Sequence, residues 1–119
     1  MAAAIGEQPG VAISDTTITP RDAPDRKYSD VTIPALQFRV TDRHTYDPTH
    51  LMVRLLVAIK QVHPNSFAVT RTGGFDRLAG SDRLRLALEE GRPADGIIAS
   101  WAEGLESFAG TREKYLIYR

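Results

Sequence analysis

The chain has 119 residues, which is enough for one domain with one hydrophobic core. Its 15 basic and 15 acidic residues balance, so no net field favours nucleic acid or an anionic membrane as a partner. It has no cysteine, which excludes disulfides and thiolate chemistry.

The N-terminal third predicts one helical turn and two strands. Residues 2–5 are small or apolar and are halted by Gly6, so we expect a helix remnant or a disordered start over residues 1–8. Residues 11–18 are rich in β-branched side chains, which predicts a strand. After a charged loop rich in turn formers, residues 35–41 alternate apolar and polar side chains and predict a half-buried second strand.

The clearest helix follows the second strand. Asp47 can accept a hydrogen bond from a free amide at the helix start, and Pro48 suits the first helical position. Apolar side chains recur at helical spacing and predict a face that packs on the core. This stripe consists of Leu51, Leu55, Ile59 and Val62. Pro64 ends the helix, and residues 66–70 predict a short strand.

Helical patterns dominate the C-terminal half of the chain. Residues 75–80 predict a single turn closed by a glycine, and Ser81 can cap a helix that Gly91 terminates. Pro93 opens a third helix with an apolar face. That face holds Ile97, Trp101, Leu105 and Phe108. The final residues 115–118, Tyr-Leu-Ile-Tyr, have strong strand preference and predict a C-terminal strand.

These elements predict an α+β fold, or an irregular α/β fold, with about three helices packed on a small mixed sheet. The C-terminal strand 115–118 needs sheet neighbours, and the strands at 11–18 and 35–41 are the expected ones. We expect a single domain over residues 9–119.

Polar groups concentrate between the second strand and the main helix, from Asp42 to Asp47. Loops at strand ends often carry α/β sites, so this segment could contact a substrate. It could equally be structural, with Asp47 capping the helix and Asp42 pairing with Arg43 or an amide. The residues alone leave both interpretations open.

A second polar segment, residues 70–80, holds paired glycines and two arginines, Arg71 and Arg77. Guanidinium groups suit an anion or a sugar carboxylate, although a tight turn with surface charge gives the same pattern. Trp101 and Tyr115 could stack on a sugar ring, but a Trp on an apolar helix face is more often part of a core.

Catalytic chemistry has little support in the sequence. No cluster of His, Asp or Glu shows metal-ligand spacing, so we expect neither a metal nor a cofactor. The glutamates lie on predicted helix surfaces rather than in a pair across a cleft, which glycoside hydrolysis requires. The glycine motifs of nucleotide sites and of nucleophile elbows are absent from the sequence.

The order of the segments carries a resemblance that no single segment does. The strand–helix junction VTDR…YDP, the turn–helix FDRLAGSDRLR and the ending W-x3-L-x2-F…R-x2-YLIY follow one another over roughly residues 9–119. In this order they resemble the C-terminal domain of the NamZ-like exo-β-N-acetylmuramidases, bacterial peptidoglycan glycosidases. Before the second strand the family pattern has a Cys and a Gly, where this chain reads TIPALQF. Pro34 removes a hydrogen-bond donor there, so we expect a remodelled edge of that strand.

The resemblance implies an auxiliary domain that forms one wall of a sugar-binding cleft. In that family a Rossmann-like domain precedes it and carries the catalytic glutamate, for which this chain has no matching position. We therefore expect no catalytic residue here and no activity of the chain alone. The residues expected to bind sugar hydroxyls or the lactyl carboxylate of N-acetylmuramic acid are Asp42, Arg43, Tyr46, Arg71, Asp76 and Arg77.

Two other hypotheses stay open at this point. The chain could be an independent binding or interaction module without a catalytic role, or a self-contained hydrolase that uses Asp42 and His44. An apolar patch left by the missing partner domain could also support a homodimer. The sequence leaves the location open between the bacterial cytoplasm and the cell envelope.

Overall fold

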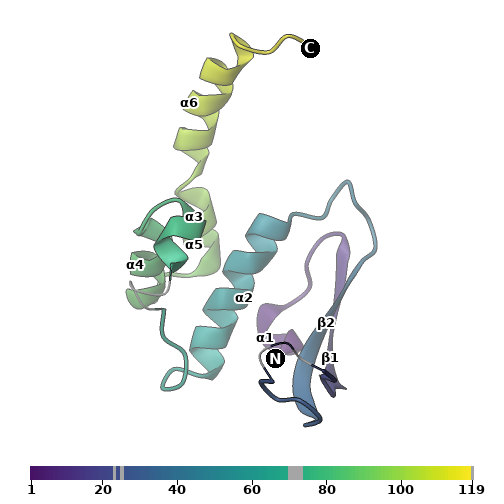
Figure 1. Ribbon diagram of the computed structural model, residues 1–119. Helices are drawn as coiled ribbons and strands as arrows, with labels where there is room; N and C mark the ends of the chain where they lie inside the picture. Colours follow the sequence, from purple (N-terminus) through teal and green to yellow (C-terminus); the bar gives the residue numbers. More distant parts are fainter. Residues whose placement is uncertain (23, 25, 70–73, 119) are drawn as a thin grey trace. The chain divides into compact units, whose positions relative to one another are not determined.

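The computed structural model describes residues 1–22, 24, 26–69 and 74–118, and the chain divides into two compact units. Unit 1 spans Met1–Val62 and unit 2 spans His63–Arg119. Figure 1 labels their helices and strands. The predicted α+β class is confirmed, because the chain combines an antiparallel sheet with several helices. A single domain over residues 9–119 stays a prediction, since two units can be two lobes of one domain.

Unit 1 is built from a β-hairpin and two helices. Its elements are α1 (Ala2–Ile5), β1 (Val11–Ile18), β2 (Ile33–Val40) and α2 (Pro48–Val62). β1 and β2 pair antiparallel, with Val11 opposite Val40. Because successive side chains of a strand alternate between faces, this register places Val11, Ile13 and Leu36 on one face of the hairpin.

The core of unit 1 lies between that face and the two helices. Its buried cluster is Ile5, Val11, Leu51 and Ala58. Met1, Ile13, Leu36, Tyr46 and Leu55 are partly buried against it. The stripe predicted for α2 is therefore correct in its first half, where Leu51 and Leu55 pack on the core. At the C-terminal end, Val62 is 47% exposed.

Among the described residues of unit 2, all regular secondary structure is helical. Its helices are α3 (Phe75–Ala79), α4 (Arg83–Glu89), α5 (Ala94–Ala99) and α6 (Ala102–Glu113). α3 contacts α4. The buried side chains of this unit are Arg85, Ala87, Leu88 and Ile97. They lie on α4 and α5, so these two helices supply the interior of unit 2.

Two predicted helix ends are confirmed in unit 2. The short α3 closes at Gly80, whose φ of 81° lies in the left-handed region. α4 ends in a Schellman motif, in which the amide of Gly91 donates to Leu88 O at 3.1 Å and that of Arg92 to Ala87 O at 3.0 Å. Gly91 permits this turn because its φ is 72°.

The third predicted helix is split into α5 and α6 at Ser100 and Trp101. The Ser100 hydroxyl donates to Ile97 O at 2.6 Å, and the Trp101 amide donates to Ile98 O at 3.1 Å, three residues back. A hydroxyl that bonds to a nearby carbonyl competes with the regular helix ladder, so the helix tightens and restarts here. The apolar face predicted for this helix is buried only at Ile97, while Leu105 and Phe108 are 62% and 63% exposed.

The predicted C-terminal strand is wrong. Over the described residues 115–118 no strand forms, and Tyr115, Ile117 and Tyr118 are 80–88% exposed. The amide of Tyr115 donates to Arg112 O at 2.9 Å, which continues the helical bonding of α6. Strand preference depends on a pairing partner, and the Tyr115 amide finds its partner in the turn that ends α6 instead.

The sheet is also smaller and simpler than predicted. Within the described chain it has two strands, β1 and β2, and is antiparallel rather than mixed. Residues 66–69 form no strand, because the amides of Ser66 and Phe67 both donate to His63 O and close a turn. Residue 70 lies outside the described residues. No helix in the described ranges is long and apolar enough to cross a membrane.

Candidate functional site

The loop between β2 and α2, residues 41–47, is anchored on Gly10. The carbonyl of Gly10 accepts hydrogen bonds from the amides of Thr41 at 2.8 Å and Asp42 at 3.2 Å. Gly10 has a φ of 70°, and a Cβ at this position would lie 2.6 Å from the Tyr46 amide nitrogen. Only glycine therefore lets the two backbone segments approach this closely.

Both aspartates of this loop bind backbone amides. Asp42 Oδ1 accepts from the His44 amide at 2.9 Å, and the Asp42 carbonyl accepts from the Tyr46 amide at 3.1 Å. The Asp42 carboxylate binds the backbone amide of His44 and not its imidazole. This bond is therefore not the acid–base pair that a self-contained hydrolase would need. Arg43 and His44 are exposed, whereas Tyr46 is half-buried against the core of unit 1.

The predicted cap of the main helix is confirmed. Asp47 Oδ1 accepts from the amides of Thr49 and His50, both at 2.9 Å. Its second oxygen lies 3.3 Å from His50 Nδ1. The carboxylate thus satisfies amides that have no partner inside the helix.

A small cavity of about 150 Å³ lies beside this loop. Thr45, Asp47 and His50 are among the residues that line it, but Asp42, Arg43 and Tyr46 are not. The structure therefore brings the three candidates of unit 1 together along one loop without placing them in one pocket.

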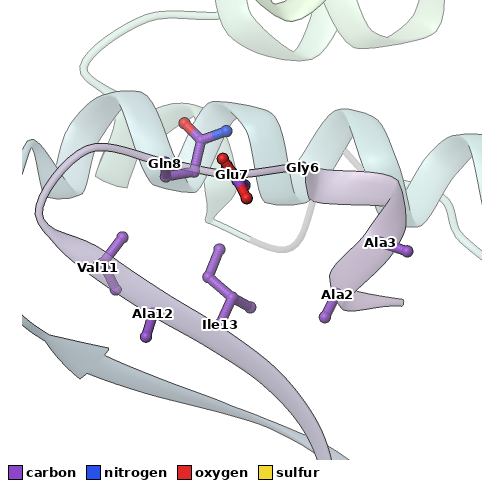
Figure 2. A pocket seen from close by; sticks show the side chains of 8 residues that line it. All are labelled: Ala2, Ala3, Gly6, Glu7, Gln8, Val11, Ala12 and Ile13. Carbon is purple, nitrogen blue, oxygen red and sulfur yellow. The ribbon is translucent and has the colours of Figure 1, made fainter.

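A larger hollow of about 620 Å³ lies between α1 and β1. Figure 2 shows Val11 and Ile13 pointing from β1 toward the segment 6–8, which carries Glu7 and Gln8. Glu7 is the one ionisable side chain among the residues that line this hollow. A lone carboxylate does not make an acid–base pair, and no sequence motif indicated a site in this region.

The candidates of unit 2 surround a buried arginine that the sequence analysis missed. Arg85 Nε donates to both carboxylate oxygens of Asp76, at 3.0 and 3.1 Å. Its NH1 group donates to both oxygens of Glu89, at 3.2 and 3.3 Å. The Arg85 side chain is only 6% exposed, so the two carboxylates neutralise a charge held away from water.

The ionisation of Arg85 follows from the same contacts. Burial by itself would lower the pKa of its guanidinium, but the hydrogen bonds to Asp76 and Glu89 outweigh burial and raise that pKa above its ordinary value. Arg85 is therefore a permanent cation that fixes α3 to α4. One signal in the sequence could have indicated it, since Arg85 and Glu89 stand four residues apart on one helix.

The remaining predicted residues are placed as follows. The carboxylate of Asp76 already binds Arg85, while Arg77 is exposed beside Gly74. Arg71 lies outside the described residues. The candidates thus fall into two groups, one on each unit. Among the described side chains, no group of three or more His, Cys, Asp or Glu could hold a metal ion.

Residues 1–118 match the family described as "Exo-beta-N-acetylmuramidase NamZ, C-terminal". The chain therefore belongs to the C-terminal domain family of the exo-β-N-acetylmuramidase NamZ, and the resemblance predicted from its sequence is confirmed.

A curated relative supports the same assignment. The chain is 33% identical over 110 residues to the peptidoglycan beta-N-acetylmuramidase NamZ of Bacillus subtilis (strain 168). The match covers 92% of this chain but 26% of the relative, so the chain spans about a quarter of that protein's length. No solved structure matches the chain significantly.

Proposed function

We propose that the chain is the auxiliary domain of a bacterial cell-wall exo-β-N-acetylmuramidase. It forms one wall of the sugar-binding cleft and is not catalytic alone. A Rossmann-like catalytic domain, outside this chain, supplies the groups that cleave the glycosidic bond. The observation that carries the proposal is the family match over residues 1–118, with a muramidase relative that is about four times as long.

The contacts of four described carboxylates support a non-catalytic role. Glycoside hydrolysis uses two carboxyl groups that face the scissile bond, one as acid and one as base or nucleophile. In this chain Asp42 and Asp47 hold backbone amides, and Asp76 and Glu89 hold Arg85. These four carboxylates already have structural partners, which makes them poor candidates for such a pair.

The proposed cleft wall comprises Asp42, Arg43, Tyr46, Arg71, Asp76 and Arg77. Within this set Arg43 and Arg77 are the best direct contacts, because both are exposed and neither guanidinium has a partner among the described residues. Asp42 and Asp76 would act by shaping the two segments that carry these arginines. Arginine suits a sugar carboxylate because its planar group can bind both oxygens.

A domain exchange tests the proposal. Residues 1–118 replace the matched quarter of the Bacillus subtilis relative, and release of a chromophore from a 4-nitrophenyl N-acetylmuramide is measured. We expect the chimera to be active and this chain alone to be inactive. In the chimera, Arg43→Ala or Arg77→Ala should raise KM, and an exposed change on β1 outside the proposed cleft wall, such as Thr16→Ala, should not.

The outcomes separate the competing functions. Release of chromophore by the chain alone would contradict the auxiliary role and favour a self-contained hydrolase. A folded chimera that binds no muramide and stays inactive would favour an independent interaction module. Circular dichroism of each protein shows whether inactivity reflects misfolding.

A further inference from the structure

Unit 2 contains a pocket of about 290 Å³ that none of the six residues predicted to bind sugar lines. It opens between α4 and the segment from α5 to Trp101. Ala87 and Ile97 are among its lining residues and are buried, with 5% and 1% exposure, so part of the wall is apolar and packed. The pocket belongs to one unit, and its shape does not depend on unit 1.

The polar lining of this pocket carries a net positive charge. Arg83 and Arg92 contribute two guanidinium groups and Glu90 contributes one carboxylate. The guanidinium of Arg83 has no ion pair or hydrogen bond within the described chain. Arg92 donates one bond, to Gly96 O at 3.4 Å, and keeps further N–H groups for a ligand.

Trp101 adds an aromatic surface to the same pocket. It is half-buried and is the single tryptophan of the chain. Its indole combines an apolar ring with one N–H donor, and that N–H has no partner among the described residues. The tryptophan predicted above as either a core residue or a sugar platform thus lines an open, positively charged pocket.

These groups together define the chemistry of a ligand. Two arginines favour a carboxylate, because guanidinium binds both of its oxygens. Glu90 needs a hydroxyl or amide N–H as its donor and would repel a dianion such as phosphate. A volume of about 290 Å³ lies near the lower limit of ~300 Å³ for ligand pockets, which suits one sugar ring rather than a glycan chain.

We propose that the pocket between α4 and Trp101 binds a carboxylate-bearing N-acetyl sugar, with Arg83 and Arg92 holding the carboxylate and Trp101 contacting the ring. The choice of this sugar rests on the proposed function, because the relative is a muramidase. N-Acetylmuramic acid has the required groups, since it carries a lactyl carboxylate, an acetamido N–H and free hydroxyls.

The fluorescence of Trp101 reports directly on this pocket, because the chain has no other tryptophan. The full chain is titrated with N-acetylmuramic acid, with N-acetylglucosamine, which lacks the carboxylate, and with lactate, which lacks the ring. We expect N-acetylmuramic acid to bind about tenfold more tightly than either probe, as a charge-assisted hydrogen bond predicts. Equal affinity for the two sugars would overturn the proposal.

Substitutions then locate the carboxylate. Arg83→Gln should weaken binding of N-acetylmuramic acid about tenfold and leave N-acetylglucosamine unchanged. Arg39→Gln, an exposed arginine on β2, is the matched control and should change neither. Because Arg92 also bonds to Gly96, Arg92→Gln is interpreted only with an unchanged circular dichroism spectrum and melting temperature.

The result also separates this proposal from the proposed function. If Arg43→Gln or Arg77→Gln abolishes binding and Arg83→Gln does not, the pocket is excluded and the cleft wall stands. If Arg83→Gln weakens binding but the domain-exchange chimera is inactive, the pocket stands and the auxiliary role fails.

Discussion

The two units stabilise their polar segments in different ways. In unit 1, Asp42 and Asp47 accept hydrogen bonds from backbone amides two or three residues further along the chain. In unit 2, Asp76 reaches a guanidinium nine residues away, on another helix. Asp42 and Asp47 of unit 1 therefore form local bonds with neutral amides, whereas Asp76 of unit 2 belongs to a buried charge network that needs partners from two helices.

This difference affects how each unit responds to mutation. A local cap can be lost while the rest of the helix stays intact, so its contribution is modest. A buried charge that loses a partner stays in a poorly solvated place, and the cost is larger. A close backbone contact tolerates even less, since neither backbone can move without breaking other hydrogen bonds.

The largest effect is expected at Gly10. Gly10→Ala adds left-handed strain and a clash with the Tyr46 amide, so we expect a loss of about 4 kcal/mol in the free energy of unfolding. Amide resonances of unit 1 should lose dispersion in NMR spectra. Gly80→Ala is the control, because Gly80 is in the left-handed region with a φ of 81° and nothing lies within 4 Å of the added Cβ. Its cost should be about 1 kcal/mol, from strain alone. Equal costs would contradict the role of the Gly10 contact.

The next effect tests the charge network of unit 2. Asp76→Ala removes the bidentate partner of Arg85, and we expect a loss of about 2 kcal/mol in chemical denaturation. The expected loss of unfolding free energy is smaller than for a fully buried ion pair, because the Asp76 side chain is 26% exposed. Arg77→Ala, one position along α3, is the control and should change stability by less than about 0.5 kcal/mol. If Asp76→Ala leaves the free energy of unfolding unchanged, Glu89 alone is enough to stabilise the buried charge of Arg85.

A smaller effect is expected at the cap of α2. Asp47→Ala should cost about 1 kcal/mol, because the amides of Thr49 and His50 lose their acceptor. Asp47→Asn should recover most of that loss, since asparagine caps helices about as well as aspartate. Thermal unfolding of the two variants measures the difference. If both lose the same stability, the charge of Asp47 matters more than its hydrogen bonds.

The smallest effect concerns Asp15 and acid pH. The Ala2 amide and then the N-terminal ammonium bind its carboxylate and lower its pKa. The pKa in the folded state is thus below the unfolded value of about 3.9, so the unfolded state binds more protons as pH falls. The contribution of Asp15 to folding stability is present above the unfolded pKa and is lost as pH falls through the folded pKa.

In the Asp15→Asn variant, the melting temperature should therefore depend less on pH below about pH 4 than in the unsubstituted protein. At neutral pH the melting temperature of the variant should be slightly lower. A parallel pH profile in both proteins would contradict this assignment.

Features that depend on near neighbours in the chain were predictable. The Asp47 cap, the two strands of the hairpin and the turn at Gly91 each follow from a few consecutive residues. Their physical basis is local, because backbone dihedral preferences and side-chain-to-amide bonds act over three or four positions. The order of such local segments was also enough to identify the family.

Features that depend on distant partners were not predictable. The sequence assigned the segment 115–118 to a strand from its composition, but the Tyr115 amide bonds to Arg112 in the turn that ends α6, and the side chains of the segment stay exposed. Arg85 was missed because its burial and its bond to Asp76 need α3 and α4 to pack together. The bond between Asp76 and Arg85 was equally invisible in the sequence, and sugar binding by Asp76 stays a prediction.

The sequence by itself determined the start of α2, the C-terminal ends of α3 and α4, the two strands of the hairpin, and the family to which the chain belongs. Only the tertiary structure decided which of the polar side chains bind other parts of the protein and which stay available to a ligand. The physical reason is that local hydrogen bonds form between neighbours in any context, whereas burial and charge pairing depend on what else occupies the surrounding space.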